Sequence, residues 1–478
     1  MNYSKIYLKP KKEESLLRFH PWVFSGAVAS AEDWVRGRPV HMKSEACSDA
    51  AASAEDWVRG RPVRMKSEAC SDAAASAEDW VHGRPVRMKS EACSDAAASA
   101  AVEDEAPMPP DALRASPAEG DIVEVYSADN QLLGIGHYQI GSIVVRILSF
   151  TPVEINVSFW TERIRQAYRL RYGLGLVASG KNDMYRLIHG EGDCLPGLII
   201  DIYAHTAVIQ AHSVGMHHAR RDIATALQTV LGTHIHRIYY KSEGTLPFKA
   251  SLGEENEYLL GAEQKEPPIA TENGLKFHID WLKGQKTGFF IDQRDNRSLL
   301  QQYAHHRTVL NLFCYTGSFS VYALRGGASL VHSVDSSAKA IALTNENIAL
   351  NFPEETRHQA FADDAFHFME NREEKYDLII LDPPAFAKHK NVIRNALQGY
   401  RKLNAIAIKK IQAGGIIFTF SCSQVVSKND FRLAVFSAAA QSGRTVRILH
   451  QLTQPADHPI NIYHPEGEYL KGLVLQVE

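Results

Sequence analysis

The sequence lacks the features that mark several classes of protein. No apolar run reaches eighteen residues, which excludes a membrane-spanning helix. Charged residues occur in the first fourteen positions, where a signal peptide needs its apolar core. The net charge is only −3, so the overall composition gives no sign of nucleic-acid binding, and any such role must rest on local basic patches. We expect a cytoplasmic protein that has no membrane partner.

Cysteine is also scarce and unpaired. Of the six cysteines, three are copies within a repeat, and the others, Cys194, Cys314 and Cys422, show no CxxC spacing. This pattern indicates neither a metal site nor a disulfide framework, and in a reducing compartment the thiols stay free. An isolated cysteine is usually a small buried hydrophobe. A chemical role for any of the three must therefore come from its surroundings.

An internal repeat is present near the N-terminus. Residues 29–97 contain one 23-residue unit three times, with Trp34, Trp57 and Trp80 marking the period. A solenoid needs each unit to bury a face against its neighbour, and this unit has few apolar residues among alanine, serine and balanced charges. We therefore expect a disordered insertion over about 29–118. A partner-binding array, or a metal or redox tract built on the repeated cysteines, is the alternative.

The rest of the chain divides into three predicted domains. Residues 1–150, apart from the insertion, hold short alternating strands with turns at SADNQ and IGS, which predicts a β-rich domain. Residues 151–270 combine a helix at 157–173 with strands, which predicts an α+β domain. From 271 to 478 apolar strands alternate with helices. This alternation is typical of a doubly wound parallel sheet, so the fold class is α/β.

Small or polar residues end the strands of this third domain. The first strand runs into NLFCYTGSFS with Gly317, and the second ends at Asp335. The others lead to FADDAF with Asp364, to LDPPAFAK with Asp382, and to SCS with Cys422. Ligands bind at the carboxyl ends of such strands. Each residue also has a structural alternative, such as a helix cap for Asp335, and the single glycine matches neither common phosphate-binding motif.

These motifs resemble a known family. Together with GQKTGFFIDQRDNR, the segments NLFCYTGSFS, LDPPAFAK and SCS resemble the PUA-domain-containing class I S-adenosylmethionine-dependent 23S ribosomal RNA (cytosine-C5)-methyltransferases. The resemblance covers nearly the whole chain except about 29–118. It implies a C-terminal Rossmann-like methyltransferase domain over 271–478, an N-terminal PUA-like domain over 1–150, and a central α+β domain over 151–270.

The resemblance also implies site residues. Cys422 would be the nucleophile, and Asp382 would orient the target base. S-adenosylmethionine would lie against the strand ends, with its ribose on Asp335 and its adenine near Asp364, and no metal would be needed. The residues that would bind the cofactor are Asp292, Arg294, Asn311, Phe313, Tyr315, Gly317, Asp335, Asp364, Asp382 and Pro383.

The chemistry explains why a cysteine would stand there. Carbon 5 of a pyrimidine is a weak nucleophile until a thiolate adds at carbon 6, which is covalent catalysis by an activated cysteine. Many RNA cytosine methyltransferases carry a second cysteine where this chain has Ala385, so the group that assists product release is open. Ser423 favours cytosine over uracil. Uracil-C5 or guanine methylation, or noncatalytic RNA binding by a vestigial methyltransferase fold, are the alternatives.

Local charge agrees with an RNA partner, here ribosomal RNA of the large subunit. Seven lysines or arginines and no acid lie between positions 388 and 410, with Tyr400, Leu403, Ala407 and Ile411 as the apolar stripe of a helix. A basic stretch of this kind would hold phosphates, although a solvated helix face is the alternative. In the helix at 157–173 we expect Leu170 on the buried face and the arginines outside. A homodimer is one option for the oligomeric state, which the sequence leaves open.

Overall fold

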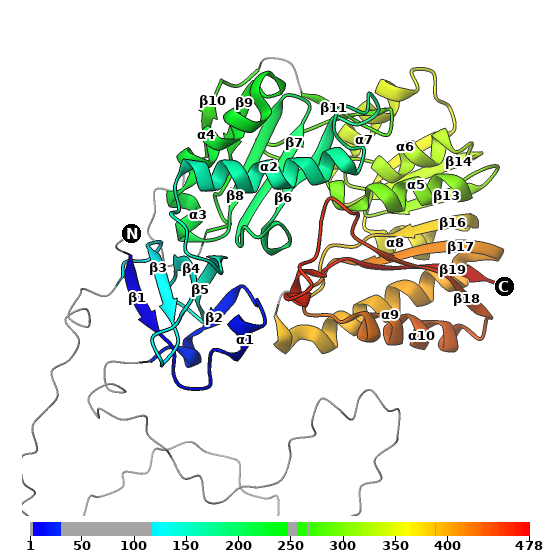
Figure 1. The fold of residues 1–478 in the computed structure, drawn as a ribbon. Coiled ribbons are helices and arrows are strands. Elements are labelled where there is room, and N and C mark those ends of the chain that lie inside the picture. The colour runs from blue at the N-terminus through cyan, green and yellow to red at the C-terminus, as the bar shows by residue number, and fades with distance from the viewer. Residues whose placement is uncertain (1–2, 30–116, 247–255, 265–267, 388) are drawn as a thin grey trace, which may run out of the picture. The chain divides into compact units, whose positions relative to one another are not determined.

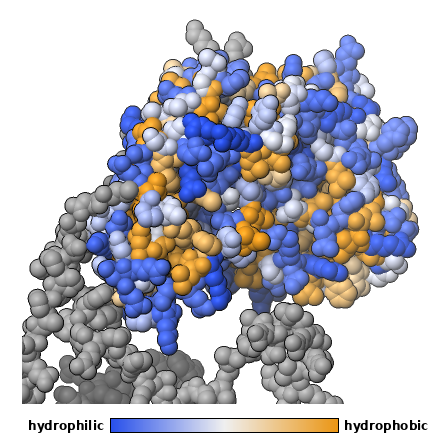
Figure 2. Space-filling model, viewed as in Figure 1, coloured by the Kyte–Doolittle hydropathy of each residue, from blue (hydrophilic) through white to orange (hydrophobic). Residues whose placement is uncertain are grey.

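The computed structural model describes residues 3–29, 117–246, 256–264, 268–387 and 389–478. Three larger sheets and one two-stranded sheet account for its strands (Figure 1). Within these residues no helix combines the length and apolar character that a membrane crossing requires. The surface in view is largely hydrophilic, with hydrophobic residues in separate groups (Figure 2). The prediction for the repeat lies outside the described residues.

The first sheet is built from the two ends of the predicted β-rich domain. Its order is β1-β3-β4-β5-β2, and only the pair β1–β3 is parallel. The short helix α1 (Glu14–Leu17) places Leu16 in the core of this sheet, which also contains Val123 and Val125. The strands are β1 (Ser4–Tyr7), β2 (Trp22–Phe24), β3 (Ile122–Tyr126), β4 (Leu132–Tyr138) and β5 (Ile143–Ser149).

The second sheet forms the predicted α+β domain, with the order β10-β9-β8-β7-β6. Its core also takes side chains from α2 and α4, including Trp160 and Leu227. The elements are α2 (Val157–Gly173), β6 (Met184–His189), β7 (Leu198–Tyr203), β8 (Thr206–Ala211), α3 (Val214–His218), α4 (Arg220–Leu231), β9 (Arg237–Tyr240) and β10 (Glu257–Leu260).

Helix α2 occupies the predicted residues, but its buried face differs from the prediction. Asn156 caps its N-terminus by accepting a hydrogen bond from the Phe159 amide. Leu170 is 43% exposed, whereas Arg171 is fully buried. The guanidinium of Arg171 donates to both carboxylate oxygens of Asp193. A bidentate carboxylate satisfies a buried arginine, and helical spacing alone does not reveal that partner.

The third sheet has seven strands in the order β15-β14-β13-β16-β17-β19-β18. The strands from β15 to β17 are parallel, while β19 pairs antiparallel with β17 and β18. The predicted parallel sheet is therefore a mixed sheet. Its strands are β13 (Thr308–Leu312), β14 (Leu330–Asp335), β15 (His358–Ala362), β16 (Tyr376–Leu381), β17 (Ile411–Ser421), β18 (Val446–Thr453) and β19 (Lys471–Val477).

Helices cover both faces of this sheet (Figure 1). In β16, Leu378 and Ile380 join a core with α5, α6 and α7, whereas Ile379 and Leu381 join a core with α8, α9 and α10. This alternation explains why the strand is apolar throughout. The helices are α5 (Arg294–Tyr303), α6 (Ser318–Arg325), α7 (Ala338–Asn351), α8 (Ala365–Asn371), α9 (Ile393–Lys410) and α10 (Lys428–Ser442), and the separate hairpin is β11 (Ile269–Glu272) with β12 (Leu275–His278).

The mixed α/β fold class is confirmed, with one correction in the basic helix. Tyr400, Leu403 and Ala407 are buried along α9 as predicted. Ile411 is buried too, but it begins β17. The helix ends at Lys410, and the backbone of Ile411 is extended, with φ −72° and ψ 146°.

Candidate active site

Strand register gathers the predicted site residues at one edge of the third sheet. Leu312 of β13 pairs with Val334 of β14 and with Leu381 of β16. Leu381 in turn pairs with Thr419 of β17. The carboxyl ends of these four parallel strands are therefore level. Phe313, Asp335 and Asp382 come one residue after the paired positions, and Cys422 comes three residues after Thr419.

The loop after β13 has an unusual backbone. Phe313 and Tyr315 have φ of +58° and +47°, in the left-handed region that non-glycine residues seldom occupy. Gly317 has φ +73°, and a Cβ there would lie 2.4 Å from Cγ2 of Thr344 in α7. The glycine is therefore required by the turn and by the close approach of α7. Strained backbone of this kind is often found at ligand sites.

Asp335 fastens this loop to the next strand. Its Oδ2 accepts a hydrogen bond from the Tyr315 amide at 3.0 Å, and its Oδ1 accepts one from the Ser337 amide at 2.9 Å. The residue that caps α7 is Ser337. Asp335 is therefore no ordinary helix cap. Each carboxylate oxygen has a second lone pair for a further donor.

Asp364, in contrast, does act as a helix cap. Its Oδ1 accepts hydrogen bonds from the amides of Phe366 and His367 at the start of α8. The residue is exposed at the same sheet edge. The structural alternative for Asp364 is thus realised, and a contact with adenine stays a prediction.

The FIDQR turn supplies two buried residues that face different partners. Oδ2 of Asp292 accepts a hydrogen bond from the Tyr469 hydroxyl at 2.7 Å and lies 3.9 Å from Nζ of Lys286. Arg294 instead donates to Asp457 Oδ2 at 3.0 Å and to the Met184 carbonyl. The guanidinium of Arg294 therefore joins strand β6 to the C-terminal segment. Its predicted role toward the cofactor stays a prediction.

Asp382 and Cys422 share an unusual electrostatic setting. Burial, together with the negative charge of Asp292, raises the pKa of Asp382 to about 7, although Gln293 donates a hydrogen bond to it at 3.1 Å. Burial also raises the pKa of the Cys422 thiol, whereas the Lys286 ammonium lowers it. Lys286 itself has φ +49°. Perturbed acids around a half-buried thiol are typical of catalytic sites.

The two serines beside Cys422 explain the SCS motif. Ser421 donates a hydrogen bond to the Tyr400 hydroxyl of α9 at 2.9 Å, and Ser423 donates one to the Ala387 carbonyl at 2.6 Å. Both serines are buried. The thiol is thus held between α9 and the loop that follows the DPP turn. The other two thiols of the described residues are not at this position, since Cys314 lies in the loop after β13 and Cys194 lies after β6.

Three residues of the site were missed from the sequence. Lys286, Gln293 and Tyr469 contact Asp292 or Asp382, as described above. Lys286 and Gln293 lie within the GQKTGFFIDQRDNR segment, so their closeness in sequence to Asp292 could have identified them as site residues. Tyr469 follows a loop far along the chain, and only the paired β17–β19 ladder brings it back to the site.

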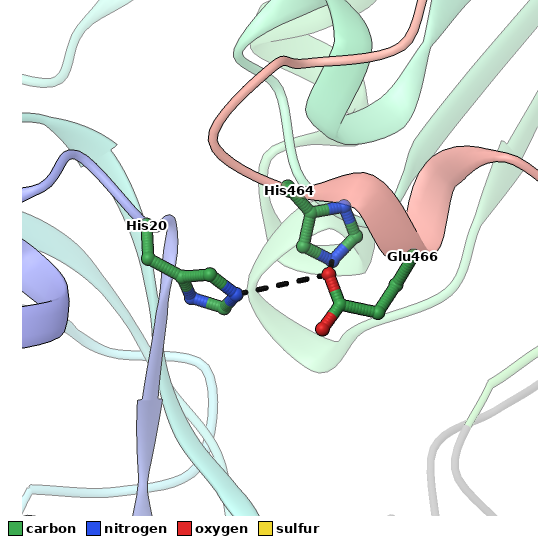
Figure 3. Close-up of side chains that lie close together, drawn as sticks. All are labelled: His20, His464 and Glu466. Atoms are coloured by element: carbon green, nitrogen blue, oxygen red, sulfur yellow. Dashed lines mark ion pairs between the residues drawn. The ribbon is translucent and has the colours of Figure 1, made fainter. Parts of the chain in front are cut away.

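A second polar cluster contains His20, His464 and Glu466 (Figure 3). In the described part of the chain, it is the cluster in which side chains that could bind a metal ion lie close together. However, Nδ1 of His20 accepts a hydrogen bond from the Trp22 amide at 3.2 Å. The proton of neutral His20 must then be on Nε2, which faces Glu466 at 3.8 Å and has no lone pair for a metal. The cluster is therefore better described as a polar contact between two segments.

Comparison with known proteins identifies two parts of the chain. Residues 185–462 match the S-adenosylmethionine-dependent methyltransferase family, and residues 6–46 and 107–150 match the PUA-like domain. The ribosomal RNA large subunit methyltransferase I of Aeromonas hydrophila is 39% identical over 76% of this chain and 92% of its own length. The protein of the same name from Escherichia coli O1:K1 is 36% identical over 75% and 91%.

Solved structures agree with this result. A methyltransferase structure in complex with SAH has a TM-score of 0.67 and 26% identity, and covers 75% of this chain and 92% of its own. An S-adenosylmethionine-dependent methyltransferase from Streptococcus mutans has a TM-score of 0.66 and 25% identity, over 76% and 93%. The chain therefore belongs to the S-adenosylmethionine-dependent methyltransferases, carries a PUA-like domain, and is a relative of the ribosomal RNA large subunit methyltransferases I.

Proposed function

We propose that the protein methylates carbon 5 of a cytosine in ribosomal RNA of the large subunit, the 23S RNA, through a covalent adduct with Cys422. The observation that supports this proposal is the thiol at the carboxyl end of β17, on the edge that also holds Asp335 and Asp382. Methylation of an exocyclic nitrogen would need no thiol there. The names of the relatives support ribosomal RNA as the substrate.

S-adenosylmethionine fits the residues at this edge. Asp335 keeps acceptor capacity for two ribose hydroxyls. Oδ1 of Asp292 and Oδ1 of Asn311 are buried and lack a hydrogen-bond donor within the described residues. A buried acceptor without a donor is costly, and the amino group of a bound methionine moiety is a donor of the missing kind. When bound, the cofactor supplies an electrophilic methyl group on a sulfonium centre.

The cysteine provides the nucleophilic carbon. The Cys422 thiolate forms a bond to carbon 6 of the cytosine, and the electron pair of the 5,6 double bond makes carbon 5 nucleophilic. After carbon 5 has received the methyl group, it loses its proton to a base. The bond between sulfur and carbon 6 then breaks, which restores the aromatic ring and the thiolate.

Two neighbouring groups would control the protons. Burial keeps the resting Cys422 as a thiol because it raises the pKa, and the charge of Lys286 favours the thiolate. Asp382, with a pKa of about 7, is present in both protonation states near neutral pH. It can therefore donate a hydrogen bond to the ring or hold a proton. The target base has to leave its stack to reach this edge.

The basic face of α9 supports an RNA partner. The exposed basic residues of this helix are Arg394, Arg401, Lys402 and Lys409. On its buried side, Tyr400 accepts a hydrogen bond from Ser421, the residue before Cys422. Phosphates bound along this face would therefore lie near the thiol. The PUA-like domain is a second candidate for contacts with RNA.

Trapping with a fluorinated base tests the proposal. RNA that carries 5-fluorocytosine at the target should form a complex that survives denaturing electrophoresis and requires S-adenosylmethionine, because fluorine cannot leave as a proton does. Cys422→Ala should abolish turnover and trapping while cofactor binding persists. Cys314→Ala and Cys194→Ala are the matched controls and should still trap. Near wild-type methylation by Cys422→Ala would contradict the covalent mechanism, and nucleoside analysis would separate 5-methylcytidine from methylated uridine or guanosine.

We also infer a cytoplasmic enzyme that forms a homodimer. Ribosomal RNA as substrate supports the cytoplasmic location.

The homodimer would bury an exposed apolar face of α10. Leu433 and Phe436 are 60% and 65% exposed there, and a second copy of the chain would bury them. Size-exclusion chromatography with light scattering should give twice the chain mass for the wild type, and Phe436→Glu should shift the protein to the monomer. A monomeric wild type would contradict the dimer.

A further inference from the structure

A buried lysine lies behind the Cys422 loop, which comprises residues 422–427 between β17 and α10. Lys471 is the first residue of β19 and is paired with Ser421, the residue before the cysteine. It is 5% exposed. Its Nζ donates hydrogen bonds to the carbonyl of Ser423 at 2.5 Å and to the carbonyl of Val426 at 2.7 Å. One ammonium therefore holds the loop immediately after the thiol.

This ammonium has no matching carboxylate. Among the described residues, no carboxylate oxygen lies within 4 Å of Lys471 Nζ, and the nearby Glu468 is ion-paired with Lys428. A buried charge with only neutral partners is costly unless another group compensates it. Burial lowers the pKa of Lys471 to about 8, while the negative charge of Cys422 and that of Glu468 raise it. The thiolate formed during the reaction is thus an anion that Lys471 can stabilise.

The loop also makes hydrogen bonds between neutral groups. Ser421 binds Tyr400, and Ser423 binds Ala387, so hydroxyl groups fix the loop from the α9 side. The Val426 amide donates to the Ser423 carbonyl at 3.3 Å. On the β19 side the loop is held by Lys471, and this attachment is a charged one.

We propose that Lys471 is a positioning residue for methyl transfer, which orders the Cys422 loop and provides a buried positive charge next to the cysteine. The proposal rests on the proposed cysteine mechanism. Lys471 acts on the loop and on the thiol, whereas the cofactor lies against the ends of β13 and β14. Loss of its charge should therefore affect the thiol and leave cofactor binding intact.

Several charged groups contribute to the pH dependence of this region. Lys286, Asp382 and Asp292 influence the Cys422 thiol, and Glu468 and Lys428 influence Lys471. Carboxylates near a thiol raise its pKa, and cations lower it. Loss of the buried charge of Lys471 should therefore raise the pKa of the Cys422 thiol, whereas the exposed Lys428 acts on Lys471 and not directly on the thiol.

The test is Lys471→Met in the full-length protein, which keeps the length of the side chain and removes its charge. Alkylation of Cys422 by iodoacetamide, followed across pH by mass spectrometry of its peptide, should show a midpoint above that of the wild type, as expected for loss of a nearby positive charge. Methyl transfer and 5-fluorocytosine trapping at pH 7.5 should slow by about tenfold or more, as expected for loss of the charge-assisted hydrogen bonds that hold the loop. The dissociation constant for S-adenosylmethionine should stay within about twofold.

Lys428→Met is the matched control, because Lys428 is a half-exposed lysine of the same neighbourhood that donates no hydrogen bond to the loop. It should alkylate, trap and methylate as the wild type does. If Lys471→Met loses cofactor binding, Lys471→Gln takes its place, because its amide can still donate to a loop carbonyl without a charge.

The outcomes separate the two proposals. A variant of Lys471 that binds S-adenosylmethionine and shows the wild-type alkylation midpoint would overturn the role of Lys471. Trapping that persists in Cys422→Ala would overturn the cysteine mechanism itself. A raised midpoint in the uncharged variants, with trapping still dependent on Cys422, would establish both.

Discussion

Replacing Asp382 with asparagine should stabilise the folded protein while it impairs function. Asp382 is held at the end of β16, where burial and the charge of Asp292 raise its pKa from 3.8 to about 7. In the unfolded chain the carboxyl group loses its proton near its ordinary pKa, whereas in the folded chain it keeps the proton up to about pH 7. Stability is therefore lost as the pH rises between these two values.

The size of the effect follows from the two pKa values. Relative to a group that carries no charge, linkage gives a loss of stability of about 2 kcal/mol at pH 5 and about 4 kcal/mol at pH 8. Asp382→Asn removes this loss and can keep the hydrogen bond from Gln293. The difference in free energy of unfolding between the variant and wild type should thus grow by about 2–3 kcal/mol between pH 5 and pH 8.

Urea denaturation followed by tryptophan fluorescence would measure this difference, since Trp281 is buried in the core on one face of the third sheet. Asp129→Asn, at an exposed turn, is the control and should show no growing advantage. An equal difference in stability between Asp382→Asn and wild type at pH 5 and pH 8, or a variant that is the less stable protein at pH 8, would contradict the raised pKa of Asp382.

Three further predictions concern the cofactor and the repeat. If the ionised Asp382 binds the amino group of S-adenosylmethionine, calorimetry should give an affinity about tenfold weaker at pH 6 than at pH 8, and Asp382→Asn should remove this dependence; equal affinities at both pH values would argue against the contact. Asp335→Ala loses charge-assisted hydrogen bonds of about 1.5–3 kcal/mol each, so affinity should fall at least about tenfold with the fold retained, and an unchanged affinity would leave Asp335 a purely structural role. Deletion of residues 29–97 should leave cofactor binding and methyl transfer nearly intact, and a cooperative loss of folded structure would show that the repeat packs.

The fold was largely predictable because its signals are local. Continuous apolar strands alternating with helices indicated the third sheet, and helical spacing located α2 at its observed residues. The antiparallel direction of β19 was not predicted, because the apolar pattern of a buried strand does not reveal the direction in which the strand runs. The burial of Arg171 was not predicted for a related reason. Its partner Asp193 is 22 positions away, and the hydrophobic periodicity of a helix does not indicate a buried ion pair.

The candidate site was predictable only where it follows strand ends. Asp335 ends an apolar strand, and Asp382 and Cys422 come directly after theirs, so their position at one edge follows from sheet geometry. Lys471 is a strand residue on the far side of β17, and its link to the cysteine depends on the antiparallel register of β19. Arg294 lies in a recognised motif, but its guanidinium turns to Asp457, which sequence proximity could not show.

Asp457 has a consequence for how the enzyme can be divided. Its carboxylate accepts hydrogen bonds from Arg294 and from the Arg186 amide, and its carbonyl accepts one from Arg171. Arg171 and Arg186 belong to the predicted central domain, so a fragment of residues 271–478 would lose one donor to the buried carboxylate and the donor to the carbonyl of Asp457. Leaving a buried acceptor without its donor costs about 1–3 kcal/mol, a sizeable part of the stability of a domain. A fragment of residues 271–478 should therefore be less stable than the same residues within the whole chain.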